Sequence, residues 1–124
     1  MIALDTSSLV AYLGGAAGDD VEMVATALDH RQAVLPPVVL TEILSDPKLS
    51  SDARSALLDL PLLDPMAGYW ERAGLLRSAV LSRGRKARVA DALIAQSCLD
   101  ASVPLVTRDR DFRQFARIAG LVLL

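Results

Sequence analysis

The sequence alternates short apolar runs with segments that have the periodicity of a helix. Met1–Leu4 is the first apolar run and Ala33–Leu35 the second, and late strands are expected at Pro104–Thr107 and Leu121–Leu124. A short strand is also expected at Leu62-Leu63. Strands separated by helices usually pair in parallel and are covered on both faces. The pattern therefore predicts an α/β fold with three layers, α/β/α, around a mainly parallel central sheet.

Seven helical segments are expected between and after these strands. Apolar spacing, capping residues and breakers place them near residues 6–13, 19–28, 37–44, 50–58, 67–81, 90–101 and 112–118. In the segment 67–81, the residues expected to be buried are Trp70, Ala73, Leu76 and Val80. A length of 124 residues fits a single domain, 1–124.

The composition is unusually apolar for a chain of this size. Apolar residues make up 52% of the chain and the mean hydropathy is +0.37. Some of this surplus is expected to cover a second subunit, so we expect a homodimer. No apolar run approaches the roughly 18 residues of a membrane-spanning helix, and the start lacks a signal-peptide pattern. With Cys98 as the single cysteine, expected in the core, the composition favours a cytoplasmic protein without disulfides or membrane contact.

Charge is divided unevenly along the chain. Residues 1–71 carry 11 acids and 3 bases, whereas residues 72–124 carry 4 acids and 10 bases. Nine of those ten bases are arginines, whose planar fork matches phosphate oxygens. The asymmetry favours an anionic partner. We expect contacts with this partner from six of these residues: Arg83, Arg85, Lys86, Arg88, Arg108 and Arg110.

Four acidic residues lie at positions where a carboxylate is costly or where ligands commonly bind. Asp5 directly follows the first strand, and Asp109 follows the strand 104–107, so both lie at carboxyl ends of strands, where α/β folds bind ligands. Glu42 and Asp91 interrupt apolar helical segments, where a buried charge is expensive unless it is paired or bound to metal. Asp5 as a helix cap, and Asp91 as a helix-dipole partner, remain structural alternatives.

Converging carboxylates repel one another unless a cation offsets their charge. Magnesium and manganese prefer carboxylate and water oxygens. Softer metals are disfavoured, because His30 and Cys98 are the only nitrogen or sulfur candidates, and we expect His30 to be a surface residue at a helix end. The sequence thus predicts a site for Mg²⁺ or Mn²⁺.

Four short motifs stand in order along the sequence: Leu4-Asp5-Thr6-Ser7, Thr41-Glu42, Asp91-Ala92-Leu93-Ile94-Ala95 and Thr107-Arg108-Asp109-Arg110-Asp111-Phe112. They resemble those of the PIN domain, in particular the VapC-type toxins of bacterial toxin–antitoxin pairs. Their order and separations match over essentially the whole chain. The resemblance implies that Asp5, Glu42, Asp91 and Asp109 form the catalytic, metal-binding cluster. Asp111 would be an auxiliary fifth acid, with Ser7 and Thr107 as polar neighbours of the metal.

By the same resemblance, the activity would be metal-dependent hydrolysis of RNA phosphodiester bonds, leaving a 5′-phosphate and a 3′-hydroxyl. A cognate antitoxin would be a partner, with its tail over the acidic groove. Three other interpretations remain. A phosphoacceptor receiver domain would need paired acids after the first strand and a late lysine, but Asp5 stands alone and the only lysines are Lys48 and Lys86. A haloacid-dehalogenase-type phosphatase would need an acid at Ser7. A non-catalytic binding module would use the acids only for docking.

Overall fold

A short parallel sheet lies at the centre of the molecule. The computed structural model describes residues 1–124, and its strands are β1 (Ile2–Leu4), β2 (Ala33–Val34) and β3 (Leu105–Val106), in the order β2-β1-β3. Ala3 of β1 is in register with Val34 and with Leu105, both in parallel. The other two expected strands form only single parallel bridges, Leu35 to Leu62 and Leu105 to Leu123. They extend the sheet without forming full strands.

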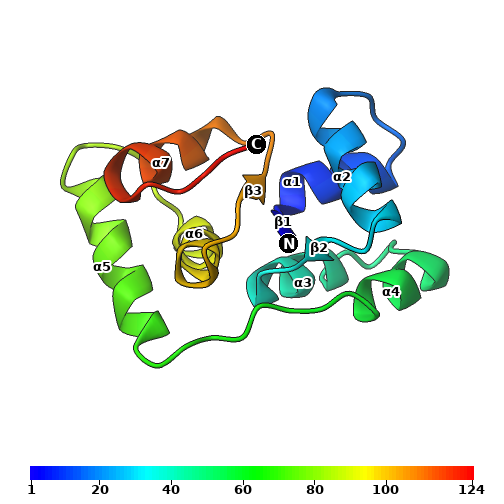
Figure 1. The fold of residues 1–124 in the computed structure, drawn as a ribbon, viewed down its shortest axis with the longest axis horizontal. Helices are drawn as coiled ribbons and strands as arrows, with labels where there is room; N and C mark the ends of the chain where they lie inside the picture. The colour runs from blue at the N-terminus through cyan, green and yellow to red at the C-terminus, as the bar shows by residue number, and fades with distance from the viewer.

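The helices fall within two residues of their expected bounds. They are α1 (Thr6–Leu13), α2 (Asp19–Asp29), α3 (Pro37–Leu44), α4 (Ser51–Leu58), α5 (Tyr69–Leu81), α6 (Val89–Ala101) and α7 (Arg113–Ala119), with a 3-10 turn η1 (Arg110–Phe112) before α7. Figure 1 shows α1 and α2 on one side of the sheet and α5, α6 and α7 on the other. The expected α/β fold with a parallel sheet is confirmed.

The connection from β1 to α1 sets the geometry of one edge of the sheet. β1 ends at Leu4, and Asp5 is the N-cap of α1, with its side chain accepting a hydrogen bond from the Ser7 amide. Because β3 runs parallel beside β1, the residue after β3, Thr107, arrives at the same edge. The sheet therefore brings together two segments that lie a hundred residues apart.

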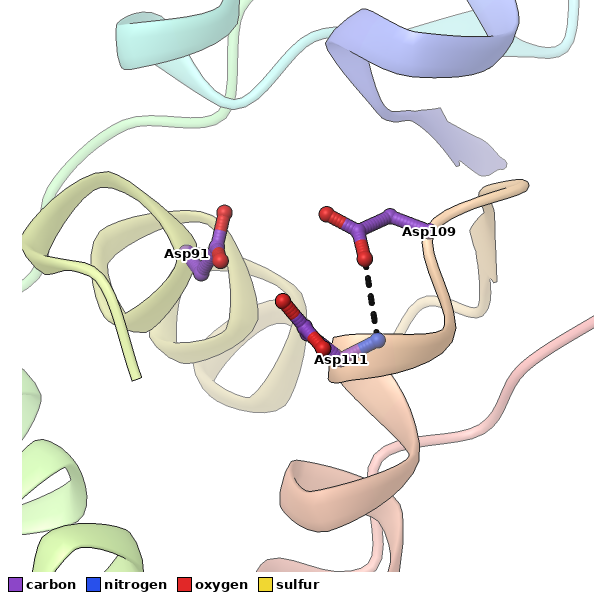
Figure 2. Close-up of side chains that lie close together, drawn as sticks. All are labelled: Asp91, Asp109 and Asp111. Atoms are coloured by element: carbon purple, nitrogen blue, oxygen red, sulfur yellow. Dashed lines mark hydrogen bonds between the residues drawn. The ribbon is translucent and has the colours of Figure 1, made fainter. Parts of the chain in front are cut away.

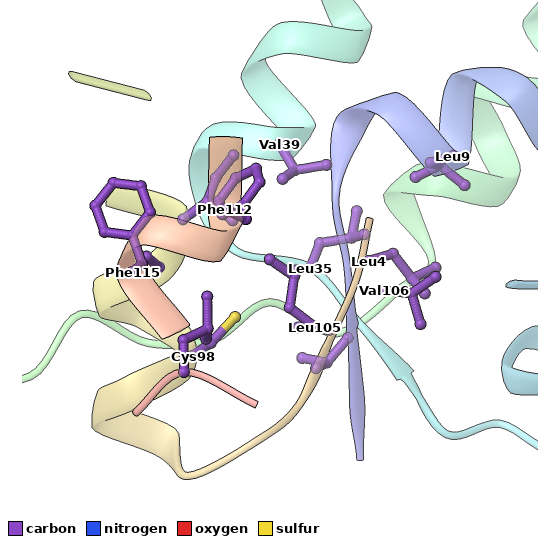
Figure 3. Packing of buried hydrophobic residues seen from close by; sticks show 14 of the residues in the cluster. Leu4, Leu9, Leu35, Val39, Cys98, Leu105, Val106, Phe112 and Phe115 are labelled. Atoms are coloured by element: carbon purple, nitrogen blue, oxygen red, sulfur yellow. The ribbon is translucent and has the colours of Figure 1, made fainter. Parts of the chain in front are cut away.

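The core packs the sheet against α6, η1 and α7. Phe112 and Phe115 are fully buried, with their ring centroids 5.9 Å apart, and they belong to the same buried cluster as Cys98 of α6 (Figure 3). Cys98 is 1% exposed, as expected for a small core residue. Around β1 and β3, Leu4 and Leu105 are also completely buried.

One expected core residue is on the surface. Ala73, Leu76 and Val80 are buried as predicted, but Trp70 is 65% exposed. The buried stripe of α5 begins one residue earlier, at Tyr69, whose hydroxyl donates to the Leu93 carbonyl of α6 at 2.7 Å. Trp70 follows on the next position around the helix and packs edge-to-face with the Tyr69 ring.

None of the helices has the length and apolarity needed to cross a membrane.

The difference between these aromatic residues predicts very different effects on stability. Phe112→Ala removes a fully buried ring and should lower the free energy of unfolding by about 3–5 kcal/mol. Trp70→Ala should change it by less than about 1 kcal/mol, as for most surface positions. Urea unfolding followed by circular dichroism at low protein concentration measures both. Equal losses in the two variants would contradict the packing described here.

Candidate metal centre

Three aspartates converge beside the carboxyl end of β3. Asp91 comes from the first turn of α6, and Asp109 and Asp111 come from the loop and the 3-10 turn that follow β3. One carboxylate oxygen from each lies within 4.8 Å of the other two (Figure 2). Figure 2 shows the Asp91 and Asp109 carboxylates facing the same space, with Asp111 below them. We call these residues the aspartate cluster.

Asp91 is the buried member of the cluster. Its side chain is only 8% exposed, and its Oδ2 atom is buried without any hydrogen-bond partner. Burial raises the pKa of the Asp91 carboxyl to about 6, and the charges of Asp109, Asp5 and Asp111 add to the effect, against a smaller opposing effect of Arg88. The expectation of a buried charge at this position is met, and the protein supplies no counter-charge in contact with it.

The local backbone fixes Asp109 and Asp111 relative to each other. The Asp109 amide donates to Thr107 Oγ1 at 3.0 Å, and Asp109 Oδ1 accepts a hydrogen bond from the Asp111 amide at 2.9 Å. Asp109 is thereby the N-cap of η1. Its Oδ2 remains free of protein hydrogen bonds and is available to a ligand. The residue assigned to an auxiliary position, Asp111, lies in the tightest group of acids.

Asp5 lies next to this cluster and is held by hydroxyl groups. Its Oδ2 accepts hydrogen bonds from Ser7 Oγ at 2.6 Å and from Thr107 Oγ1 at 2.7 Å. Its side chain is 4% exposed and is close enough to raise the pKa of Asp91. Both polar residues expected near the metal, Ser7 and Thr107, therefore contact Asp5 directly. They orient one carboxylate oxygen and leave the other, Oδ1, without a protein hydrogen bond.

Glu42 lies outside the cluster of three. It projects from α3 and accepts a hydrogen bond from Thr6 Oγ1 at 2.7 Å, which links it to the residue after Asp5. The premise that Glu42 is a buried charge is wrong, because its side chain is exposed. The buried face of α3 is formed by Val39 and Ile43, and Glu42 is on the polar side of an otherwise apolar helix.

Arg108, expected among the RNA contacts, is occupied within the protein. Its guanidinium binds Asp20 through two bonds, Nε to Oδ2 at 2.8 Å and Nη2 to Oδ1 at 3.0 Å. The Arg108 hydrogen bond holds the pKa of Asp20 at about 2, well below its ordinary value. A Cβ atom at Gly18 would lie 2.6 Å from Asp20 Oδ1 and 3.1 Å from Arg108 Nη2, so a larger residue there would displace this ion pair, and the φ of +147° also favours glycine. Asp20 reads in the sequence only as the start of a helix, so its partner could not be foreseen.

The other expected RNA contacts are free at the surface. Arg83, Arg85, Lys86 and Arg88 are all exposed on the segment that joins α5 to α6. This segment is anchored by the buried Ala87, whose carbonyl accepts a hydrogen bond from Arg77 Nε at 2.8 Å. Arg88, the last residue of this segment, lies three positions before Asp91 and is close enough to act on its pKa. This end of the basic segment therefore lies near the aspartate cluster.

The residues present fit a hard divalent cation. Every donor in the cluster is a carboxylate, which is the ligand type that Mg²⁺ and Mn²⁺ prefer. The buried Asp91 Oδ2 without a partner is the kind of atom that a cation satisfies. Nitrogen and sulfur ligands are absent here, since Cys98 is buried in the core and His30 ends α2 at the surface as expected.

The raised pKa of Asp91 predicts a stability change with pH in the absence of metal. An acid whose pKa is raised by folding destabilises the fold as pH rises from its unfolded pKa, 3.8, through its folded pKa, about 6. A shift of about two units corresponds to about 2–3 kcal/mol. Asp91→Asn should therefore be more stable than the wild type at pH 7 and similar to it at pH 4. Urea unfolding in EDTA at both pH values measures the free energy of unfolding of the two proteins. The same difference between Asp91→Asn and the wild type at pH 4 and at pH 7 would contradict the burial of an ionised Asp91.

Comparisons with known proteins relate the whole chain to one family and fold. The PIN domain family model matches residues 2–118. The fold is similar to VapBC2 from Rickettsia felis, solved bound to a DNA fragment from its promoter, with a TM-score of 0.73, 25% identity and coverage of 100% of this chain and 98% of that one. VapBC-5 of the VapBC toxin–antitoxin family from Mycobacterium tuberculosis is similar at a TM-score of 0.68 and 22% identity, covering 98% and 95%.

FitAcB from Neisseria gonorrhoeae is a third similar structure, at a TM-score of 0.64 and 20% identity, covering 100% of this chain and 96% of that one. No curated protein matches the sequence. Because the family model spans nearly the whole chain, the chain belongs to the PIN domain family.

Proposed function

We propose that the protein is a Mg²⁺- or Mn²⁺-dependent endoribonuclease, the toxin of a toxin–antitoxin pair. The observation that carries this proposal is the buried, unpartnered Asp91 carboxylate in a cluster with Asp109 and Asp111. A purely structural acid would have a cation or a hydrogen-bond donor beside it. Membership of the PIN family, whose members are typically nucleases, supports hydrolysis of a phosphodiester bond.

In this proposal each acid has a defined role in binding the cation. Asp91, Asp109 and Asp111 would bind the cation, and Asp5 would direct its free oxygen into the same space. Glu42 would approach from α3 on the Thr6 side. When bound, a divalent cation supplies a Lewis acid that polarises the phosphate and offsets the charge that develops during hydrolysis. Ser7 and Thr107 keep Asp5 in one rotamer by donating to the same oxygen.

The basic segment before α6 would bind the RNA backbone. Arg83, Arg85, Lys86 and Arg88 are exposed, and contacts to phosphate position a nucleic acid without reading its sequence. RNA as the substrate, and the cytoplasm as the compartment, follow from the resemblance to VapC-type toxins. A non-catalytic PIN module is the alternative, and a cleavage assay separates the two.

An antitoxin would bind the groove that leads to Glu42. A hollow of about 390 Å³ lies between α1, α3 and α4, with Val10 and Leu13 exposed at its apolar side. Glu42 and Asp46 line the same hollow, with Lys48 as its one base. An apolar surface with an excess of acid suits an amphipathic segment that carries arginine or lysine. A basic side chain of that segment would reach the carboxylates and displace the cation.

The site assignment predicts loss of cleavage without loss of folding. Asp91→Asn and Asp109→Asn each remove a charged ligand at nearly constant volume, so the cleavage rate should fall at least about a hundredfold. Asp59→Asn, which changes an exposed acid at the end of α4, is the matched control and should retain the wild-type rate. The assay is cleavage of total cellular RNA with Mn²⁺ or EDTA, and circular dichroism verifies the fold. Wild-type rates in both variants would exclude this site.

The exposed apolar residues of α5 and α6 predict a dimer. Trp70, Leu81 and Val89 border a hollow of about 720 Å³ between these helices, and each is at least 44% exposed. We propose that a second copy covers this surface. Trp70→Glu should then shift the protein from dimer to monomer in analytical ultracentrifugation, whereas Leu58→Glu, at an equally exposed position on α4, should not. A monomeric wild type at micromolar concentrations would rule out the homodimer.

A further inference from the structure

Most arginines of residues 72–124, the basic half of the chain, form no ion pair with an acid. The structure contains two ion pairs, Arg72 with Asp100 and Arg108 with Asp20. Arg110 stands between Asp109 and Asp111 in the chain, yet it forms an ion pair with neither, and Arg113 is equally unpaired. Both are exposed, and neither guanidinium donates a hydrogen bond within the protein. Their charges are therefore available to a ligand.

These two arginines face a common hollow. It has a volume of about 310 Å³ and is lined by Thr107, Arg108, Asp109, Arg110 and Arg113, together with Leu123 and Leu124. Arg108 contributes little free charge there, because its guanidinium is bound to Asp20. The one acidic side chain of the lining, Asp109, extends its carboxylate toward Asp91 and Asp111 (Figure 2). The remaining cations, Arg110 and Arg113, give the hollow its positive character.

The shared residue Asp109 links this hollow to the aspartate cluster. Two arginines that line one hollow repel each other unless an anion lies between them, and their planar forks match the oxygens of a phosphate. A ligand that occupies both the hollow and the aspartate cluster must carry more than one phosphate along an extended chain. A polynucleotide has this property, whereas a single phosphate group does not.

We propose that the hollow binds a backbone phosphate of the RNA, neighbouring the phosphodiester at the aspartate cluster, through Arg110 and Arg113. The proposal rests on the proposed ribonuclease function and adds a second binding position to it. Arg110 and Arg113 hold the strand and take no part in bond cleavage. None of the sequence motifs includes Arg113, because it lies beyond their last acid, on α7.

The test is the salt dependence of RNA binding without cleavage. Binding of a fluorescein-labelled single-stranded RNA oligonucleotide is measured in EDTA by anisotropy over a series of salt concentrations. Arg110→Gln and Arg113→Gln should each weaken binding and flatten the slope of log K against log salt by about 0.7. Arg113→Lys should keep the slope, since the charge remains, while binding more weakly than the wild type because the fork is lost.

Arg117→Gln is the matched control. Arg117 is exposed on α7, one turn after Arg113, and does not line the hollow, so this variant should keep the wild-type slope and affinity. Slopes for Arg110→Gln and Arg113→Gln equal to that of Arg117→Gln would overturn the phosphate position. A wild type that does not bind the oligonucleotide overturns it as well. A wild type that binds but does not cleave with Mn²⁺ refutes the ribonuclease proposal alone and leaves the slopes to decide on the hollow.

Discussion

The repulsion among carboxylates at one edge of the sheet is the constraint around which this structure is arranged. Asp91 is buried with an oxygen that has no partner, and Asp109, Asp111 and Asp5 all act in the same direction on its pKa. Such an arrangement lowers the stability of the metal-free fold, and it persists because the surrounding packing holds each residue in place. The energy that it costs is what a divalent cation would recover on binding, so the proposed cation site would be the same feature as the destabilised one.

The fold holds these acids by three independent means. Parallel pairing of β1 with β3 brings Asp5 and Thr107 to one edge, where a hydrogen bond joins them at 2.7 Å. Fully buried residues of η1 and α7, Phe112 and Phe115, fix the turn that carries Asp109 and Asp111. On the far side of that turn, the Arg108–Asp20 pair anchors the chain to the start of α2. Each acid thus rests on a rigid element, which keeps the site preorganised.

Much of this could be predicted from the sequence, because local patterns determine it. Apolar runs and caps located every helix, and the position of Asp5 and Asp109 after strands indicated a shared edge. Local patterns do not determine which side of a helix is buried, or which residues far apart in the sequence form an ion pair. Trp70 and Tyr69 are adjacent aromatic residues, and only the contacts with α6 decide that Tyr69 turns inward. Glu42 interrupts an apolar run but lies on the exposed side of α3. Arg108 was expected to contact RNA, but its guanidinium binds Asp20, 88 residues away in sequence, and no local pattern indicates this pair.

The account depends on a cation relieving the repulsion in the aspartate cluster, and melting temperature tests this directly. Wild type, Asp109→Asn and Asp59→Asn are melted in EDTA and in Mn²⁺. A ligand at about a hundredfold excess over its Kd adds about 2.7 kcal/mol, so Mn²⁺ should raise the wild-type melting temperature by several degrees. Asp109→Asn keeps an oxygen that can accept from the Asp111 amide. It should melt above the wild type in EDTA and lose most of the Mn²⁺ shift, while Asp59→Asn follows the wild type. An Asp109→Asn variant that melts below the wild type in EDTA and keeps the full Mn²⁺ shift would contradict the account.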